Sequence, residues 1–339
     1  MKTSWFIGKV RLPFCITNHF VMFNYQQPLK YLKIAVFISS GLLLAGCEAN
    51  AKSHQSALTT CTDCNWNIEQ WKITLPVSGD DYYNNGRSSA AELIPQECNG
   101  KEYLTNGTNL PWFSRESVNG EERLKFTVDL GGQVSTTPNT KYVRSELREL
   151  YNYDSENRCS TKEQNWAVTG THELKATLSV DQFPDKEVTG SDPKVVLGQI
   201  HGKDIKQALV KLQWDGENKP VRVVLNDSFL SGNKVCSDCK PFSVNLGYAP
   251  ANLDWDYTIR LDDQGIYLST LINDELTEQF LPWGVETEDR DGNKVTLSKA
   301  WLEEEYYFKA GLYAQIKPSR EFAGQVFSVS FSKINIDHN

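Results

Sequence analysis

The chain lacks several features that mark common protein classes. Its 339 residues contain only two methionines, Met1 and Met22, and both lie upstream of every segment that is patterned like a folded domain. No stretch of useful length repeats apolar residues at the spacing of an amphipathic helix, so a helical bundle is excluded. A G-x-G-x-x-G fingerprint, a phosphate-binding loop and internal repeats are also missing, which excludes the usual nucleotide-binding and repeat classes.

Positive charge is scarce as well. The chain has 35 Lys and Arg against 43 Asp and Glu, a formal charge of −8. The first 46 residues hold five basic and no acidic side chains, so without them the charge becomes −13. A protein this acidic is a poor partner for nucleic acid or for an anionic membrane surface. If its ligand is an anion, the positive charge that binds it must be local.

The N-terminal region reads as an export signal that starts at Met22. Two lysines precede an apolar run over 34–44, which is too short to span a membrane. The run ends in Leu-Ala-Gly-Cys, which resembles a bacterial lipobox whose cysteine, here Cys47, is acylated and becomes the new N-terminus. We therefore expect a lipoprotein signal peptide over 22–46. The alternative is a plain secretory peptide cut near Ala51.

Two flanking segments complete this organisation. Residues 1–21 have no role in either scheme and are expected to be dispensable. Residues 47–64 begin with mostly small and polar side chains, which predicts a tether. A folded domain is expected to follow over 65–339. Glu48 after the cysteine favours, by resemblance to Gram-negative lipoproteins, an outer-membrane location over a periplasmic or secreted one. Membrane contact is then expected only through the lipid, and we expect a monomer.

Six cysteines remain in the mature region after Cys15 and Cys47 are set aside. An even number in an exported chain predicts disulfides. Two C-x-x-C pairs could instead supply four thiolates to a zinc ion, but an oxidising compartment disfavours this, and we expect no metal. The pairing itself is left open by the sequence. The six are Cys61, Cys64, Cys98, Cys159, Cys236 and Cys239.

The region 65–339 is patterned as an all-β domain. Segments that alternate in polarity or are rich in β-branched and aromatic residues predict strands, and turn signals such as Asn119-Gly120 and Asp291-Gly292 separate them. One or two helical turns are expected over 299–305. We predict a β-jelly-roll sandwich of two antiparallel sheets with a concave substrate groove, and candidate loops over that groove at 80–89 and 230–241. The predicted strands are 71–75, 124–128, 173–180, 221–225, 257–261, 266–272 and 326–336.

Three of the extended segments place polar side chains in rows. Alternation puts Arg144, Glu146 and Arg148 on one face, where a carboxylate between two cations could hold guanidinium donors ready for an anion. A surface strand with a salt-bridge ladder is the alternative.

The other two segments have the same form. In 195–202, Gln199 and His201 share a face opposite Ile200. In 306–315, the shared face holds Tyr307, Lys309, Gly311, Tyr313 and Gln315, and the mid-strand glycine suggests close approach of a ligand or of another backbone.

These segments read R-S-E-L-R at 144–148, Q-I-H at 199–201 and Y-F-K-A-G-L-Y-A-Q at 307–315. They resemble, in order, the three signature blocks of the family-seven alginate lyases, and 66–76 resembles the family's first strand. The resemblance implies a jelly roll that cuts poly-uronate chains by β-elimination without a cofactor. Ala314 departs from the usual asparagine, but it points away from Tyr313. Ile200 in the Q-x-H block implies activity on guluronate or mixed blocks.

The chemistry of β-elimination fits the same residues. The enzyme must neutralise the uronate carboxylate, remove the C5 proton and protonate the departing O4. Arg144 and Gln199 suit the first task, with Glu146 and Arg148 holding the array, and Tyr313 and His201 suit the other two. Lys309 and the arginines are expected to favour the phenolate of Tyr313. Tyr307, Lys309 and Gln315 are expected to bind substrate.

Two other functions remain open from the sequence. A glycoside hydrolase needs two carboxylates flanking one bond, and Glu146 and Glu149 point to opposite faces. A non-catalytic carbohydrate-binding lipoprotein would keep the groove without needing both Tyr313 and His201.

Overall fold

The computed structural model describes residues 64–98, 101–153, 159–161, 164–203, 205, 207–228 and 240–339. The predicted export signal, including Cys47, lies outside these residues, as do Cys61, Cys236 and Cys239. Most of the predicted loop 230–241 also lies outside them.

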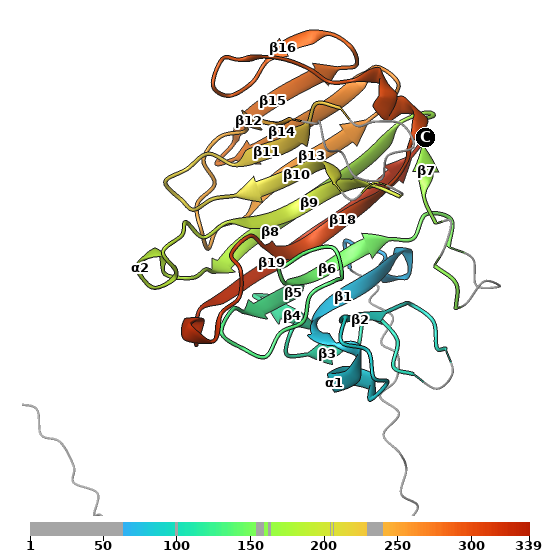
Figure 1. The fold of residues 1–339 in the computed structure, drawn as a ribbon, viewed down its shortest axis with the longest axis vertical. Coiled ribbons are helices and arrows are strands. Elements are labelled where there is room, and N and C mark those ends of the chain that lie inside the picture. The colour runs from blue at the N-terminus through green and yellow to red at the C-terminus, as the bar shows by residue number, and fades with distance from the viewer. Residues whose placement is uncertain are drawn as a thin grey trace, which may run out of the picture. The chain divides into compact units, whose positions relative to one another are not determined.

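Two large antiparallel sheets lie one behind the other, as expected for the predicted sandwich (Figure 1). The first sheet has the order β12-β11-β10-β9-β18-β6-β1-β2, with β7 paired to β18. Its strands are β1 (Trp71–Ser78), β2 (Ala90–Leu93), β6 (Arg144–Glu149), β7 (Trp166–Ala167), β9 (Val195–Gly202), β10 (Ala208–Trp214), β11 (Arg222–Asn226), β12 (Pro241–Asn245) and β18 (Glu305–Ala314).

The second sheet has the order β15-β14-β13-β8-β19-β5-β4-β3. Its strands are β3 (Asn109–Leu110), β4 (Phe113–Val118), β5 (Glu121–Asp129), β8 (His172–Gln182), β13 (Trp255–Leu261), β14 (Gly265–Ile272), β15 (Glu275–Pro282) and β19 (Val326–His338). A separate hairpin is formed by β16 (Glu286–Glu288) and β17 (Lys294–Thr296). All seven predicted strands are confirmed, as β1, β5, β8, β11, β13, β14 and β19.

The described helices are all short. They are α1 (Gly79–Tyr83), α2 (Lys186–Thr189) and the 3₁₀ helices η1 (Ile68–Gln70), η3 (Lys299–Glu303) and η4 (Arg320–Phe322). The turn expected over 299–305 is therefore confirmed as η3, but the loop predicted over 80–89 begins inside α1. The Ser78 side chain accepts the Asp81 N–H at the start of α1, and Asn84 ends the helix in the left-handed conformation. No described helix is long and apolar enough to cross a membrane.

Alternating burial along β6 illustrates how the sheets form the core. Ser145 and Leu147 are fully buried between the sheets, whereas Arg144 and Arg148 stay partly exposed on the opposite face. Ile200 of β9 and Phe308 of β18 are likewise buried. Each such apolar side chain contributes about 1.5–3 kcal/mol when removed from water. The inward faces thus hold the sandwich together and leave the outward face of the first sheet to polar groups.

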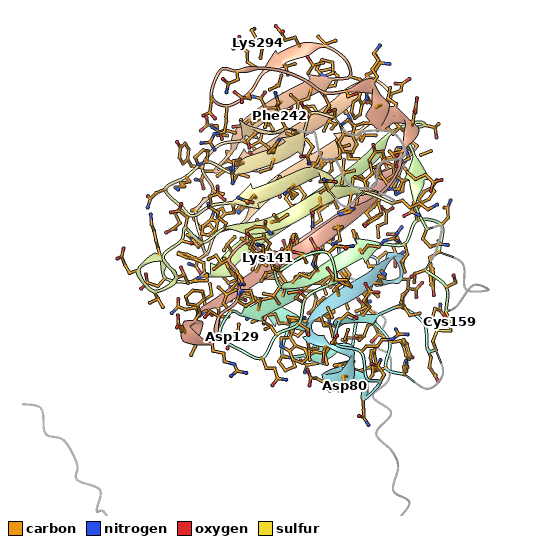
Figure 2. The ribbon with its side chains drawn as sticks, in the orientation of Figure 1. Asp80, Asp129, Lys141, Cys159, Phe242 and Lys294 are labelled. Atoms are coloured by element: carbon orange, nitrogen blue, oxygen red, sulfur yellow. A yellow bond between two sulfur atoms is a disulfide. The ribbon has the colours of Figure 1, made fainter. Side chains whose placement is uncertain are left out.

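Turns and a disulfide fix the strand connections. Asn119 and Gly120 have φ of 55° and 84° between β4 and β5, which is the two-residue hairpin that an Asn-Gly pair predicts. Cys159, labelled in Figure 2, forms a disulfide with Cys98. Cys64 is also disulfide-bonded. The three described cysteines of the mature region are therefore oxidised, as predicted.

Candidate active site

The three polar segments singled out in the sequence lie on neighbouring strands, although 50 or more residues separate them along the chain. β18 lies between β6 and β9 in the middle of the first sheet (Figure 1). The register places Lys309 opposite both Arg148 and Gln199, and Tyr307 opposite His201. Antiparallel pairing thus brings the three rows of side chains to one face of the sheet.

A cleft of about 740 Å³ lies on this face of the sheet. Eight of the nine predicted site residues line it, and Glu146 lies beneath them. The eight are Arg144, Arg148, Gln199, His201, Tyr307, Lys309, Tyr313 and Gln315. None of the residues 80–89 is among the described lining residues; several of them line a neighbouring hollow that shares Glu92 and Thr137 with the cleft.

Glu146 is the central acceptor of the site. Its side chain is 1% exposed. Arg144 Nη1 lies 3.0 Å from Oε2, and both the Lys309 ammonium and the Gln199 amide donate to the carboxylate. Burial alone would raise the pKa of Glu146, but the charges of Lys309 and Arg144 outweigh burial and hold the pKa below its ordinary value. Glu146 is therefore an anion that orients three donors.

Arg148 does not share Glu146 with Arg144, which corrects the expected row of one carboxylate between two arginines. Its guanidinium donates to the Glu149 carbonyl at 2.6 Å, to the Gln164 carbonyl at 3.1 Å and to Asn165 Oδ1 at 2.6 Å. Lys309, opposite Arg148 on β18, takes the carboxylate oxygen that a second arginine would need. Arg148 instead lies over the Tyr307 ring, 4.1 Å from its centroid.

Tyr313 contacts Thr140, Arg144 and the ring of Tyr142, whose centroid lies 6.4 Å from its own. Its hydroxyl lies 2.8 Å from Thr140 Oγ1, and the Arg144 guanidinium carbon lies 3.8 Å from the ring centroid. Of the cations expected beside Tyr313, Arg144 is in contact with it, whereas Lys309 is bound to Glu146.

His201 is oriented so that one ring nitrogen can act as a base. Its Nδ1 lies 2.8 Å from the Gly202 carbonyl, and because a carbonyl can only accept, Nδ1 carries the hydrogen. Nε2 then carries the lone pair. Burial, followed by the charges of Lys309 and Arg144, lowers the pKa of His201 to about 4. The imidazole is thus neutral at neutral pH.

Tyr307 and Lys309, which were expected to bind substrate, line the cleft beside His201 and Glu146. Tyr307 stacks on the His201 ring at 5.3 Å between centroids, and its hydroxyl lies 3.1 Å from His201 Nδ1. Burial and the nearby charge of Arg144, opposed by Glu146, lower the pKa of Lys309 to about 8. Gln315 donates to the carbonyls of Tyr313 and Ala314 at 3.4 and 3.2 Å.

Gly311 approaches another backbone and not the cleft. Its φ is +131°, and β18 bulges against β9 at this point. A Cβ at this position would lie 3.0 Å from the Glu146 Cα and from the Ser145 carbonyl oxygen, and 3.1 Å from the core ring of Phe126. Of the two explanations for the glycine, a ligand or another backbone, the close approach of another backbone is confirmed.

Several cleft residues were missed from the sequence. Thr140 and Tyr142 line the cleft from the loop before β6, a segment without strand periodicity. Lys211 was missed on β10, although Lys211 and Gln213 alternate with buried Leu212 and Trp214 as the recognised strands do. Lys72, paired with Glu92 at 2.9 Å, lines the end of the cleft at β1 and β2.

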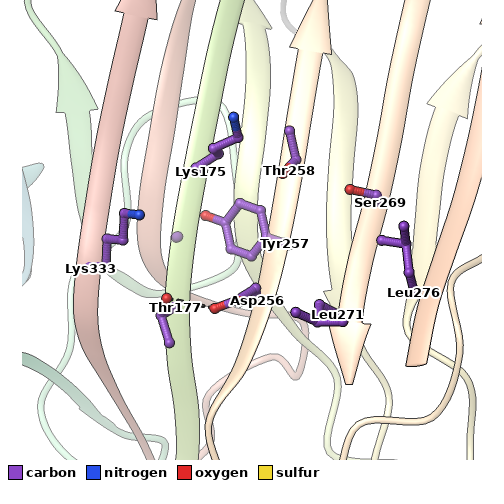
Figure 3. A pocket seen from close by; sticks show the side chains of 10 residues that line it. Lys175, Thr177, Asp256, Tyr257, Thr258, Ser269, Leu271, Leu276 and Lys333 are labelled. Carbon is purple, nitrogen blue, oxygen red and sulfur yellow. Dashed lines mark hydrogen bonds between the residues drawn. The ribbon is translucent and has the colours of Figure 1, made fainter. Parts of the chain in front are cut away.

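The second sheet carries a smaller hollow of about 210 Å³ on its outer face (Figure 3). Lys175 and Lys333 point toward it, and Thr177 donates to Asp256 at its floor. It has no counterpart of the Arg144, His201 and Tyr313 grouping among its lining residues. Within the described residues, no group of three or more His, Cys, Asp or Glu is placed to hold a metal ion.

The fold and the cleft define a β-sandwich protein with a polar groove across the middle of one sheet. The alginate lyase family model matches residues 66–338, and the chain therefore belongs to the alginate lyase family, polysaccharide lyase family 7. A curated alginate lyase from Klebsiella pneumoniae is 26% identical over 183 residues, which are 49% of this chain and 54% of that protein. The chain thus spans about half the length of the curated relative that it matches.

Solved structures agree on the fold. The alginate lyase from Klebsiella pneumoniae has a TM-score of 0.59 at 18% identity, over 81% of this chain and 97% of that chain. The alginate lyase from Pseudomonas aeruginosa has a TM-score of 0.52 at 22% identity, over 81% and 100%. Alginate lyase A1-II′, a member of polysaccharide lyase family 7, has a TM-score of 0.54 at 21% identity, over 81% and 97%. The predicted β-jelly roll is confirmed.

Proposed function

We propose that this protein is an alginate lyase that cleaves the 1,4 bonds of guluronate and mannuronate chains by β-elimination and releases unsaturated oligosaccharides. The observation that carries the proposal is the grouping of Arg144, Gln199, His201 and Tyr313 in one cleft on three adjacent strands. Family membership supports it. So do the solved complexes of alginate lyase A1-II′ with product and with substrate, both made with variants in which a tyrosine is replaced by phenylalanine.

Arg144 and Gln199 bind the carboxylate of the sugar that loses its proton. Each donates one hydrogen bond to Glu146. Each also retains further N–H groups for the substrate, because a guanidinium has five and an amide has two. Neutralising this carboxylate stabilises the negative charge that develops when the C5 proton leaves. Glu146 and Lys309 fix the positions of these donors and do not themselves need to touch the sugar.

Tyr313 and His201 move the proton. The C5–H bond gives its proton to a base, the C4–O4 bond breaks as the C4=C5 bond forms, and the departing O4 takes a proton from an acid. In mannuronate the C5 hydrogen and O4 are on the same side of the ring, so Tyr313 serves as both base and acid. In guluronate they are on opposite sides, so His201 is the base and Tyr313 the acid. Neutral His201 with a lone pair on Nε2 has the form that this role requires.

Two variants test these roles. Tyr313→Phe should abolish cleavage of both block types, whereas His201→Ala should reduce guluronate cleavage far more than mannuronate cleavage. General acid–base groups contribute about 10²- to 10⁴-fold, so initial rates on block-enriched alginates would resolve the difference. Equal losses on both substrates from a folded His201→Ala protein would instead assign His201 to carboxylate neutralisation.

The cleft does not favour a hydrolase. Glu92 is the only carboxylate among its described lining residues, and it is bound to Lys72 and Thr74. A hydrolase needs a second carboxylate on the other side of the bond. Incubation with alginate separates the classes: ultraviolet absorbance from a new C4=C5 bond supports a lyase, cleavage without that absorbance a hydrolase, and binding without cleavage a lectin-like module.

We also propose that the protein is exported and anchored in the outer membrane through acylated Cys47, and that it acts as a monomer. The Leu-Ala-Gly-Cys sequence after an apolar run supports this location, and the disulfides support an oxidising compartment. Mass spectrometry of the N-terminal peptide should find an acylated cysteine. An unmodified N-terminus beyond Ala49 would refute the anchor, and light scattering would test the monomer.

A further inference from the structure

A row of polar residues crosses the cleft at right angles to the strands. The pairing registers place one residue on each of five consecutive strands directly opposite the next. Neighbouring strands lie about 4.8 Å apart, so the row samples the cleft at short, regular intervals. From β1 to β10 the row is Lys72, Arg148, Lys309, Gln199 and Lys211.

Most cations of this row are already bound within the protein. Lys72 pairs with Glu92 and Lys309 with Glu146. Arg148 is held by carbonyl and amide oxygens. Lys211, at the β10 end, has neither an anionic partner nor a hydrogen-bond partner for its ammonium in the part of the chain that the structure describes.

The described surroundings of Lys211 do not supply its ammonium with a counter-ion either. Its charged neighbour Arg222 is a cation, which is itself paired with Asp215 at 3.2 Å. Burial, followed by the like charge of Arg222, lowers the pKa of Lys211. A partly buried ammonium without a counter-ion costs free energy, and an anion entering the cleft would recover it.

We propose that Lys211 binds the carboxylate of a second uronate, the sugar on the β10 side of the one that is held by Arg144 and Gln199. This inference rests on the proposed function and assigns a subsite within it. Lys211 lies opposite Gln199 on the adjacent strand and lines the same cleft. Its ammonium therefore requires a charged sugar at that position, and a neutral hexose there would leave it unpaired.

A structural role for Lys211 makes a different prediction. If its aliphatic stem only covered apolar surface, the loss of the charge would leave substrate binding unchanged. Lys211→Met keeps the length of the stem and removes the charge, whereas Lys211→Arg keeps the charge. Lys333→Met, at the hollow on the second sheet, is a matched control for the loss of one positive charge (Figure 3).

The experiment measures kcat, KM and their salt dependence for the four proteins on guluronate and mannuronate oligomers. Lys211→Met should raise KM about tenfold, the value of one hydrogen bond to a charged group, with kcat changed less than twofold. Its kcat/KM should also fall less steeply with added salt. Lys211→Arg should recover most of the affinity that Lys211→Met loses, and Lys333→Met should stay close to the parent. An unchanged KM in Lys211→Met, or a fall in kcat alone, would overturn the assignment.

Calorimetric titration with the same oligomers separates this subsite from the lyase activity. If the parent binds oligomers without cleaving them, the proposed reaction is wrong. In that case a tenfold loss of affinity in Lys211→Met would still support the Lys211 assignment, and an unchanged affinity would refute it. If the parent neither binds nor cleaves them, both are wrong. Thermal unfolding of each variant shows whether a loss reflects the subsite or the fold.

Discussion

Thr140 Oγ1 lies 2.8 Å from the hydroxyl of Tyr313 and ties the loop before β6 to the end of β18. The same oxygen accepts the Tyr142 N–H at 3.1 Å, so one lone pair and the hydroxyl hydrogen remain for Tyr313. The Thr140 hydroxyl can therefore accept a hydrogen bond when Tyr313 is a phenol, and donate one when Tyr313 is a phenolate. This makes Thr140 a positioning residue that suits both protonation states of a group that must take and return a proton.

Thr140→Val should slow cleavage by about 3- to 10-fold through kcat, with KM little changed, because a neutral hydrogen bond contributes about 1 kcal/mol. Thr140→Ser restores the hydroxyl and should restore most of the rate. Initial rates followed by ultraviolet absorbance on both block types would show this. A Thr140→Ser protein as slow as Thr140→Val would mean that the methyl packing, and not the hydroxyl, matters.

The sequence was sufficient for most of the fold and for which side chains of β6, β9 and β18 face away from the core. Strict alternation on β6, β9 and β18 separated the cleft residues from Leu147, Ile200 and Phe308, because one face of each strand had to be apolar. Period-two patterning cannot give the order of the strands, so it could not establish that the three segments are neighbours in the sheet.

Contacts made by loops and by competing partners could not be read from the sequence. Thr140 reaches Tyr313 across 173 residues from a segment without periodicity. Arg148 was expected to pair with Glu146, but Lys309 on the neighbouring strand takes that oxygen. The α1 turn was missed because its cap depends on the Ser78 side chain, which sits at the end of a strand.

The pH dependence of kcat/KM should have an acid limb near pH 4 and an alkaline limb near pH 8. His201 must be neutral to act as a base, and its pKa of about 4 keeps it neutral above that pH. Lys309, with a pKa of about 8, loses above that pH the charge that balances Glu146. Stopped-assay rates across the pH range on guluronate oligomers would define both limbs.

Lys309→Arg and Lys309→Met extend this test. Arginine stays charged throughout, so Lys309→Arg should move the alkaline limb upward. Lys309→Met removes a charge that lowers the pKa of His201, so its acid limb should move upward. An acid limb near 6.5 in the parent would contradict the assignment, since a histidine in water titrates there.

Glu146→Gln should cost about 3 to 5 kcal/mol of unfolding free energy, because Lys309 and Arg144 would lose their buried counter-ion. Adding Lys309→Met should recover part of this loss by removing one unpaired charge. Urea unfolding of the parent, the two single variants and the double variant gives the coupling energy. Additive losses would show that Glu146 and Lys309 stabilise the fold independently.

A partly buried network of two histidines and Glu149 joins the two sheets. Nδ1 of His172 lies 2.7 Å from Nδ1 of His338, whose Nε2 lies 2.7 Å from Glu149 Oε1. Nε2 of His172 lies 3.0 Å from the Thr169 carbonyl, which can only accept, so His172 Nε2 carries the hydrogen. Neutral His172 then accepts at Nδ1 from His338, and a second proton on His172 would oppose this bond.

Burial, followed by the charge of His338, lowers the pKa of His172. Below the ordinary histidine pKa of about 6.5 the unfolded chain therefore binds a proton that the folded chain does not. Stability from this group is present above that pH and is lost as the pH falls toward the folded-state pKa.

The ring of His172 also stacks on Trp166, with 4.1 Å between the ring centroids, so His172→Phe preserves the shape of the side chain while removing its titration. At pH 7 the variant should be about 1–3 kcal/mol less stable, because His338 loses its acceptor. Between pH 7 and 5 the difference in unfolding free energy between parent and variant should shrink, as measured by urea unfolding at several pH values. Parallel stability curves would show that His172 contributes packing alone.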